Sequence, residues 1–184
     1  RISCNAAISA CAKGARWELA LVMLDSMFHL KVHPNVISCN AAISACEKGG
    51  QWQMGLVLLD SMFHLKVQPS VISCNAAISA CEKGAQWQIA LALLDSMPQR
   101  QVKPDVFSCS ATMSACEKSA QWQVALELLG SMPRLRVQPN AISFNAVISA
   151  CEKGTQWQIA LALLHFMPQA RVRANVISCS AAIS

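Results

Sequence analysis

The chain repeats itself every 35 residues, and this period limits the possible folds more than any other feature of the sequence. Tryptophan recurs at that interval without a slip, at Trp17, Trp52, Trp87, Trp122 and Trp157. A fixed period of this length indicates a stacked array, in which each unit buries its apolar face against its neighbours. The units are 1–35, 36–70, 71–105, 106–140 and 141–175, followed by a partial unit 176–184. We number positions from 1 within each unit and expect a single array that is a piece of a longer protein.

Composition narrows the class of protein further. Of the 184 residues, 54% are hydrophobic and 14% are charged, and the net charge is +5. A membrane-spanning helix needs about 20 consecutive apolar residues, whereas Asn, Ser, Glu and Lys interrupt the apolar runs of this chain. We therefore expect a buried helical array with no membrane segment, whose positive charge permits an anionic partner.

Each unit has the apolar pattern of two helices. Apolar residues at positions 4, 7, 8 and 11 share one face of a helix over positions 3–13, and those at 17, 20, 21, 24 and 27 share one face of a second helix that begins near position 16. Glycine at position 14 is expected to end the first helix in a left-handed conformation, and proline at position 34 ends the unit. The predicted fold is all-α, a right-handed α-solenoid of helix–turn–helix repeats with about five complete units.

Tryptophan and cysteine are predicted to be structural. The tryptophan at position 17 lies on the apolar face of the second helix and is expected to pack against the next unit. The ten cysteines occupy positions 4 and 11, which are about 10.5 Å apart along a helix and too distant for a disulfide within it. Because the sequence has no CxxC pair and no histidine at ligand spacing, we expect buried apolar thiols and no metal or cofactor.

A second stripe of the first helix comprises positions 2, 5, 9, 12 and 13 and is mostly polar, with a large apolar residue at position 2. Position 5 is restricted to Asn and Ser, although asparagine is neutral to unfavourable inside a helix. A position that merely faced solvent would accept many residue types, so the restriction indicates a role. The residues at position 5 are Asn5, Asn40, Asn75, Ser110, Asn145 and Ser180.

The period, the helical hairpin, Asn at position 5, Lys at position 13 and a closing proline followed by Asn, Ser or Asp together resemble the pentatricopeptide repeat family over essentially the whole chain. Tetratricopeptide arrays repeat at about 34 residues and carry tryptophan early in the first helix, whereas here tryptophan opens the second. Cysteine in place of an aromatic residue at position 4 departs from the family pattern, as does the lack of glycine near position 30. These departures concern packing and loop shape.

The resemblance implies that single-stranded RNA lies in a concave groove, with one base per unit read by positions 5 and 35 and flanked by a bulky residue at position 2. The implied base-reading pairs are Asn5 with Asn35, Asn40 with Ser70, Asn75 with Asp105, Ser110 with Asn140, and Asn145 with Asn175. The implied base-sandwiching residues are Ile2, Ile37, Ile72, Phe107, Ile142 and Ile177. For the lysines of position 13, phosphate contacts and plain exposed charges beside Glu at position 12 are equal alternatives; they are Lys13, Lys48, Lys83, Lys118 and Lys153.

The hydrogen-bonding groups of the pairs predict a target sequence. Ionised Asp105 only accepts, so it favours a base with a ring N–H, which is uracil or guanine. Asn or Ser at position 35 donates to the bare ring nitrogen of cytosine or adenine. Asn at position 5 reaches a small pyrimidine, whereas the shorter Ser110 leaves room for a purine. Units one to five are thus predicted to bind 5′-YCUAY-3′, where Y is a pyrimidine.

Two other classes of function were weighed against RNA binding. Four scattered histidines and the lack of a recurring carboxylate pair predict no catalysis in this segment. A helical-repeat scaffold for a peptide or protein partner is the alternative, but a peptide groove gains nothing from restricting position 5 to Asn and Ser. By resemblance, we expect a role in the RNA metabolism of mitochondria or plastids, with protein partners through the rest of the parent chain. Basic residues between units are either solvated loop charges or contacts to a nucleic-acid backbone; they are Lys31, Lys66, Arg100, Lys103, Arg134, Arg136, Arg171 and Arg173.

Overall fold

The computed structural model describes the backbone of residues 2–183 and the side chains of residues 3–181, and in this range it contains eleven helices and no strands. The odd-numbered helices open the units; they are α1 (Ile2–Lys13), α3 (Val36–Lys48), α5 (Val71–Lys83), α7 (Val106–Lys118), α9 (Ala141–Lys153) and α11 (Val176–Ile183). The even-numbered helices follow them; they are α2 (Trp17–His29), α4 (Trp52–His64), α6 (Trp87–Ser96), α8 (Trp122–Ser131) and α10 (Trp157–Phe166).

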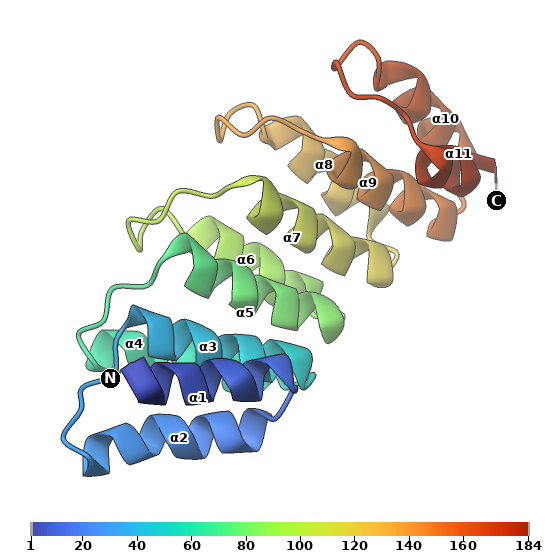
Figure 1. Ribbon diagram of the computed structural model, residues 1–184. Coiled ribbons are helices and arrows are strands. Elements are labelled where there is room, and N and C mark those ends of the chain that lie inside the picture. The colour runs from blue at the N-terminus through green and yellow to red at the C-terminus, as the bar shows by residue number, and fades with distance from the viewer. Residues whose placement is uncertain (1, 184) are drawn as a thin grey trace.

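The helices form two rows, and only in one of them do successive helices pack against each other. Each odd-numbered helix packs against the odd-numbered helices before and after it and against the adjacent even-numbered helices. The even-numbered helices have no such contacts with one another among the described residues, so the odd row is the inner side of a curved stack. Figure 1 shows the pairs following one another from α1 and α2 (blue) to α10 and α11 (red), with the chain ends at opposite ends of the stack. The predicted all-helical solenoid is confirmed.

From α3 on, the odd-numbered helices begin at position 1, two residues before the predicted start, and in α3, α5, α7 and α9 position 35 of the preceding unit caps them. The Oδ1 of Asn35 accepts hydrogen bonds from the backbone N–H groups of Ile37 and Ser38, both at 3.0 Å. In return, the Ser38 hydroxyl accepts from the Asn35 N–H at 2.8 Å. This reciprocal arrangement is a capping box, and it recurs at the start of α5, α7 and α9.

The expectation that glycine at position 14 adopts a left-handed conformation is wrong. The φ angles of Gly49, Gly84 and Gly154 are −80°, −81° and −86°. Positive φ belongs to position 15, as at Ala85 (53°), and the N–H of position 16 then bonds to the carbonyl of position 11, which completes a Schellman turn. Glycine is required there because a side chain would clash with the preceding unit: a Cβ on Gly84 would lie 2.5 Å from Cδ1 of Trp52.

The same close approach confirms that tryptophan packs against the next unit. Trp17 lies against Gly49 and Trp122 against Gly154 as Trp52 does against Gly84. In the fourth unit Ser119 occupies position 14, and its hydroxyl donates to the carbonyl of Ala85 at 3.1 Å.

The even-numbered helices differ in length because of proline. α2 and α4 have 13 residues each, whereas α6, α8 and α10 have 10. Position 28 is phenylalanine in the first two units and Pro98, Pro133 or Pro168 in the others. Proline has no N–H to donate and clashes with the preceding turn, so the shorter helices end at position 26.

The core lies between the two rows. Residues at positions 8 and 27 are fully buried; they are Ile8, Ile43, Ile78, Met113 and Ile148, and Met27, Met62, Met97, Met132 and Met167. Seven of the ten cysteines are also buried, and those with more exposure lie in the first unit and the last partial unit. Burial raises the pKa of Cys46, Cys81, Cys109 and Cys116 to about 11. These thiols are therefore uncharged at neutral pH and pack as small apolar groups, as predicted.

Candidate nucleic-acid interface

The polar stripe of the odd-numbered helices lines a groove along the inner row. One hollow of about 430 Å³ is bordered by residues of successive units, including Ile72, Asn75, Phe107, Ser110, Asn140 and Ile142. A second hollow of about 380 Å³ lies nearer the N-terminus and includes Ile37, Asn40, Ile72, Lys13 and Lys48. The fold thus brings positions 2, 5 and 35, which are distant in sequence, to one surface.

Position 2 carries large apolar side chains that are mostly in solvent. Their exposed fractions lie between 56% and 68%; the residues are Ile37, Ile72, Phe107, Ile142 and Ile177. A regular row of exposed apolar residues is unusual on a free surface and indicates a site that a partner covers. The side chain of Ile2, which was assigned the same role, lies outside the described side chains.

Positions 5 and 35 are hydrogen-bonded to each other in four of the five units. The asparagine Nδ2 of position 5 donates to position 35 in each case. The distances are 3.5 Å for Asn5 to Asn35, 3.3 Å for Asn40 to Ser70, 3.1 and 3.2 Å for Asn75 to the two oxygens of Asp105, and 3.3 Å for Asn145 to Asn175. The two residues of each of these pairs therefore act as one preorganised group.

Sequence reasoning missed that position 35 is a helix cap. Asn, Ser and Asp are the preferred N-cap residues, so the restricted composition of position 35 has a structural cause that is independent of any ligand. The spacing could have revealed it, because serine follows every position-35 residue by three places, as in a capping box. These serines at position 3 are Ser38, Ser73, Ser108, Ser143 and Ser178.

The cap also decides which atom of position 35 remains for a ligand. A backbone N–H only donates, so an oxygen must turn toward the helix. Oδ1 of Asp105 accepts from the N–H of Ser108 at 2.9 Å, and Oδ1 of Asn140 accepts from the N–H of Ser143 at 3.0 Å. The atom that the cap does not use is Nδ2 in Asn140, a donor, and Oδ2 in Asp105, an acceptor that takes one bond from Asn75 and keeps a second lone pair. Identical backbones thus offer opposite hydrogen-bonding groups.

The fourth unit lacks the bond between positions 5 and 35. Ser110 is only 7% exposed, and its hydroxyl lies 3.0 Å from that of Ser143 rather than near Asn140. The side chain of position 5 is therefore drawn back into the wall of the groove, where Asn75 in the third unit extends to Asp105. A larger base in this unit stays a prediction.

The serine of position 3 is a further member of the site that sequence reasoning missed. The hydroxyl of Ser73 donates to Oδ1 of Asn40 and so fixes the orientation of that amide. The hydroxyl of Ser108 instead bonds within its own cap, to the carbonyl of Asp105, and Oδ1 of Asn75 is buried without a partner. The five serines that follow position 35 are fully buried, and Ser73, Ser143 and Ser178 each join the helix cap to the position-5 side chain of the preceding unit.

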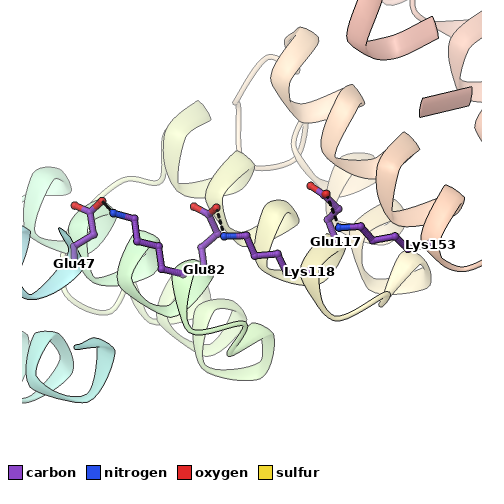
Figure 2. A network of polar contacts seen from close by, with 6 residues as sticks. Glu47, Glu82, Glu117, Lys118 and Lys153 are labelled. Atoms are coloured by element: carbon purple, nitrogen blue, oxygen red, sulfur yellow. Dashed lines mark hydrogen bonds and ion pairs between the residues drawn. The ribbon is translucent and has the colours of Figure 1, made fainter. Parts of the chain in front are cut away.

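The lysines of position 13 lie along the same row, but three of them are already in ion pairs. Each bond joins a lysine to the glutamate of the preceding unit rather than to the glutamate next to it in sequence. Lys83 pairs with Glu47 at 3.0 Å. Figure 2 shows Lys118 with Glu82, at 3.0 Å, and Lys153 with Glu117, at 2.9 Å. For these lysines the contact with glutamate competes with the expected contact to phosphate.

The basic residues between units do not share one environment. Lys103 and Arg136 border a hollow of about 830 Å³ that adjoins the position-35 residues Asp105 and Asn140. The guanidinium of Arg100 instead lies over the ring of Phe63, 5.0 Å from its centroid, which is a packing interaction. A nucleic-acid contact from Lys103 or Arg136 stays a prediction.

In residues 3–181, no three His, Cys, Asp or Glu side chains come together in a way that could hold a metal ion. No described helix is both long enough and apolar enough to cross a bilayer.

Solved structures with the same architecture include the pentatricopeptide repeat protein PPR10 from maize. It is 20% identical, with a TM-score of 0.75 over 98% of this chain and 26% of that chain. Its complex with an 18-nt psaJ RNA element gives 19% identity and a TM-score of 0.79, over 95% of this chain and 26% of that chain. The chain thus spans about a quarter of the maize protein.

A second solved relative is the PPR domain of protein-only RNase P 1 from Arabidopsis thaliana, in complex with tRNA. It is 14% identical, with a TM-score of 0.78 over 94% of this chain and 91% of that chain. At these identities the likeness establishes the fold. A comparison with curated protein sequences finds no match.

Family profiles match the repeats directly. The pentatricopeptide repeat domain profile matches residues 57–119 and 92–154, and the PPR repeat profile matches residues 2–32, 37–67 and 142–172. Together these segments cover most of the sequence. The chain therefore belongs to the pentatricopeptide repeat family.

Proposed function

We propose that this chain binds single-stranded RNA along its inner groove, one base per unit, with the preference 5′-YCUAY-3′ over units one to five. The observation that carries the proposal is the geometry of position 35. Its helix cap takes up one oxygen and leaves a defined donor or acceptor beside the exposed apolar residue of position 2. The solved complexes of PPR10 with an RNA element and of the PRORP1 domain with tRNA support the class of ligand.

The third and fourth units carry the sharpest preferences. In the third, the acceptor Oδ2 of Asp105 suits the ring N–H of uracil, and the extended Asn75 limits the base to a pyrimidine. In the fourth, the donor Nδ2 of Asn140 suits the bare N1 of adenine, and the withdrawn Ser110 leaves room for a purine. Asn at both reading positions of the first and fifth units supplies a donor beside a long side chain, which favours a pyrimidine with a bare ring nitrogen.

The second unit differs because Ser70 has few free hydrogen-bonding sites. Its hydroxyl accepts from the Ser73 N–H and from Asn40, both at 3.3 Å, and lies 3.1 Å from the Ser73 hydroxyl. The Ser70 proton must turn away from Ser73 to donate to the N3 of cytosine. We therefore place cytosine here with a smaller discrimination than at the third and fourth units.

The test is binding to an RNA that contains 5′-CCUAC-3′ against the same RNA with its A changed to C. Stacking contributes about 1–3 kcal/mol per base before ordering costs, so five units are expected to bind in about the micromolar range. The change of A to C is expected to weaken binding by roughly tenfold, about 1.4 kcal/mol. Equal affinities at matched salt would contradict the predicted sequence.

A control separates base recognition from general attraction to RNA. The variant Asn140→Ala removes the position-35 side chain of the fourth unit, so it should bind the two RNAs with similar affinity. Its helix must first be shown by circular dichroism to be intact, because the cap is also lost. If the unsubstituted chain binds neither RNA at any salt concentration, a peptide-binding scaffold replaces RNA binding as the favoured function.

We also place this binding in the RNA metabolism of mitochondria or plastids, as expected from the family. The experiment is localisation of the full-length parent protein fused to a fluorescent protein at its C-terminus. Fluorescence confined to either organelle is the expected outcome, and fluorescence throughout the cytosol or nucleus would contradict it.

A further inference from the structure

The ion pairs of the inner row follow a strict register. A lysine of position 13 meets the glutamate of position 12 in the preceding unit, 36 residues earlier, and the bond recurs at three successive unit boundaries. The three lysines are still 39% to 44% exposed, and their glutamate partners are 20% to 24% exposed. The pairs are therefore open to a ligand in the groove, and as partly exposed pairs they add only about 0–1 kcal/mol each to stability.

The register is interrupted at one place, and the cause is a single residue. Position 12 is Ala12 in the first unit and glutamate in every other complete unit. Lys48, which should pair with position 12 of the first unit, has no acidic partner among the described side chains. Lys13, in the first unit, has none in that range either.

The two hollows of the groove consequently differ in charge. The hollow near the N-terminus is lined by Lys13 and Lys48 and by no carboxylate. The larger hollow over the middle units is lined by Glu47 and Glu82 and by no lysine. Among the lysines of position 13, a strand of RNA that follows the groove therefore meets unpaired cations near the N-terminus and paired ones over the middle units.

Free and paired lysines respond differently to a phosphate. When a free lysine contacts a phosphate of a single strand, one condensed cation is released and the slope of log K against log salt changes by about −0.7. When a paired lysine does so, it must leave its glutamate, and the freed carboxylate attracts a cation from solution. The release and the uptake roughly cancel, so a paired lysine adds little to the salt dependence.

We propose that the glutamates of position 12 hold the lysines of the middle units in ion pairs and so prevent their phosphate contacts. Lys13 and Lys48 then form the main phosphate anchor of this array. The inference rests on the proposed RNA-binding function and concerns a different property of it. Bases are selected along the whole groove, whereas the electrostatic attraction is concentrated over the first two units.

The experiment measures how the affinity for an RNA containing 5′-CCUAC-3′ depends on salt between about 50 and about 200 mM, where phosphate contacts dominate the change. Lys48→Gln should reduce the magnitude of the slope by about 0.7, and the matched variant Lys118→Gln should leave it unchanged. Glu82→Gln frees Lys118 and should increase the slope by about 0.7. Ala12→Glu supplies the missing partner of Lys48 and should act like Lys48→Gln.

The outcomes separate the two proposals. Equal losses from Lys48→Gln and Lys118→Gln, or no gain from Glu82→Gln, would overturn the anchor while leaving RNA binding in place. Absence of RNA binding by the unsubstituted chain would overturn both. Thermal unfolding serves as the control for folding. Lys48→Gln, Lys118→Gln and Glu82→Gln replace exposed or partly exposed side chains and should leave the unfolding temperature nearly the same. Ala12 is only 5% exposed, so the slope of Ala12→Glu is compared only if its unfolding temperature is also kept, and the other three variants decide the proposal without it.

Discussion

The third and fourth units are built on the same backbone and are proposed to bind different bases. In the third, Asn75 spans the groove wall to the carboxylate of Asp105. In the fourth, Ser110 stops at the hydroxyl of Ser143, and Asn140 is left to the helix cap alone. Under the proposed function, a change of base preference requires no change of fold: the length of one side chain and the identity of one atom are what differ between the two units.

The largest expected effect is an exchange of the atom that position 35 presents. Asp105→Asn keeps an oxygen for the cap of α7 and replaces the outward acceptor with a donor, so the third unit should change its preference from uracil to cytosine. A hydrogen bond to a charged group is worth about 1.5–3 kcal/mol. The ratio of affinities for the RNA with uracil and the RNA with cytosine at the third unit should therefore shift by roughly tenfold or more. Competition binding with both RNAs measures it.

The reciprocal variant makes the comparison symmetric. Asn140→Asp should turn the preference of the fourth unit from adenine to guanine, because the ring N–H of guanine suits the new acceptor. If both variants keep the base preferences of the unsubstituted chain, position 35 acts only as a helix cap.

The next effect concerns the close contact between units. Gly84→Ala in the third unit would place a Cβ 2.5 Å from Trp52 and should destabilise the chain by about 1–3 kcal/mol, as overpacked sites do. Gly14→Ala is the control, since the nearest atom to its Cβ is 3.6 Å away. Urea unfolding of both variants measures the difference, and equal stabilities would show that Trp52 moves aside at little cost.

A smaller difference should separate the two capping serines. Ser108→Ala and Ser143→Ala each remove a capping box, but only Ser143→Ala also leaves the buried hydroxyl of Ser110 without its partner. We expect Ser143→Ala to cost about 1 kcal/mol more in free energy of unfolding. Equal costs in urea unfolding would mean that Ser110 finds another acceptor.

The smallest effect tests what the two units share. Burial raises the pKa of Cys81 and Cys116 from 9.0 to about 11. At pH values between these limits the unfolded chain releases thiol protons that the folded chain retains, so stability falls as the pH rises from about 9 to about 11. Cys81→Ala and Cys116→Ala should weaken this pH dependence of the urea midpoint equally, each measured against the unsubstituted chain.

Much of the fold could be predicted from the sequence because burial follows the spacing of apolar residues. The period, the two helices of each unit, the buried cysteines and the packing of Trp52 against the next unit were all predicted correctly. The role of glycine at position 14 was not, since the sequence shows only that a side chain is excluded there. Whether a left-handed φ or a neighbouring tryptophan excludes it depends on a residue of another unit.

The candidate site was likewise predictable in part from the sequence and in part only from the structure. The sequence alone determined which residues vary along the groove and which hydrogen-bonding groups they can offer, because these are properties of each side chain. Only the tertiary structure showed that Asp105 caps α7 while bonded to Asn75. Likewise, only the structure showed that Lys118 is bound to Glu82, whereas Lys48 has no acidic partner among the described side chains. The stacking of one odd-numbered helix on the next sets the offset between units, and that offset decides which side chains meet.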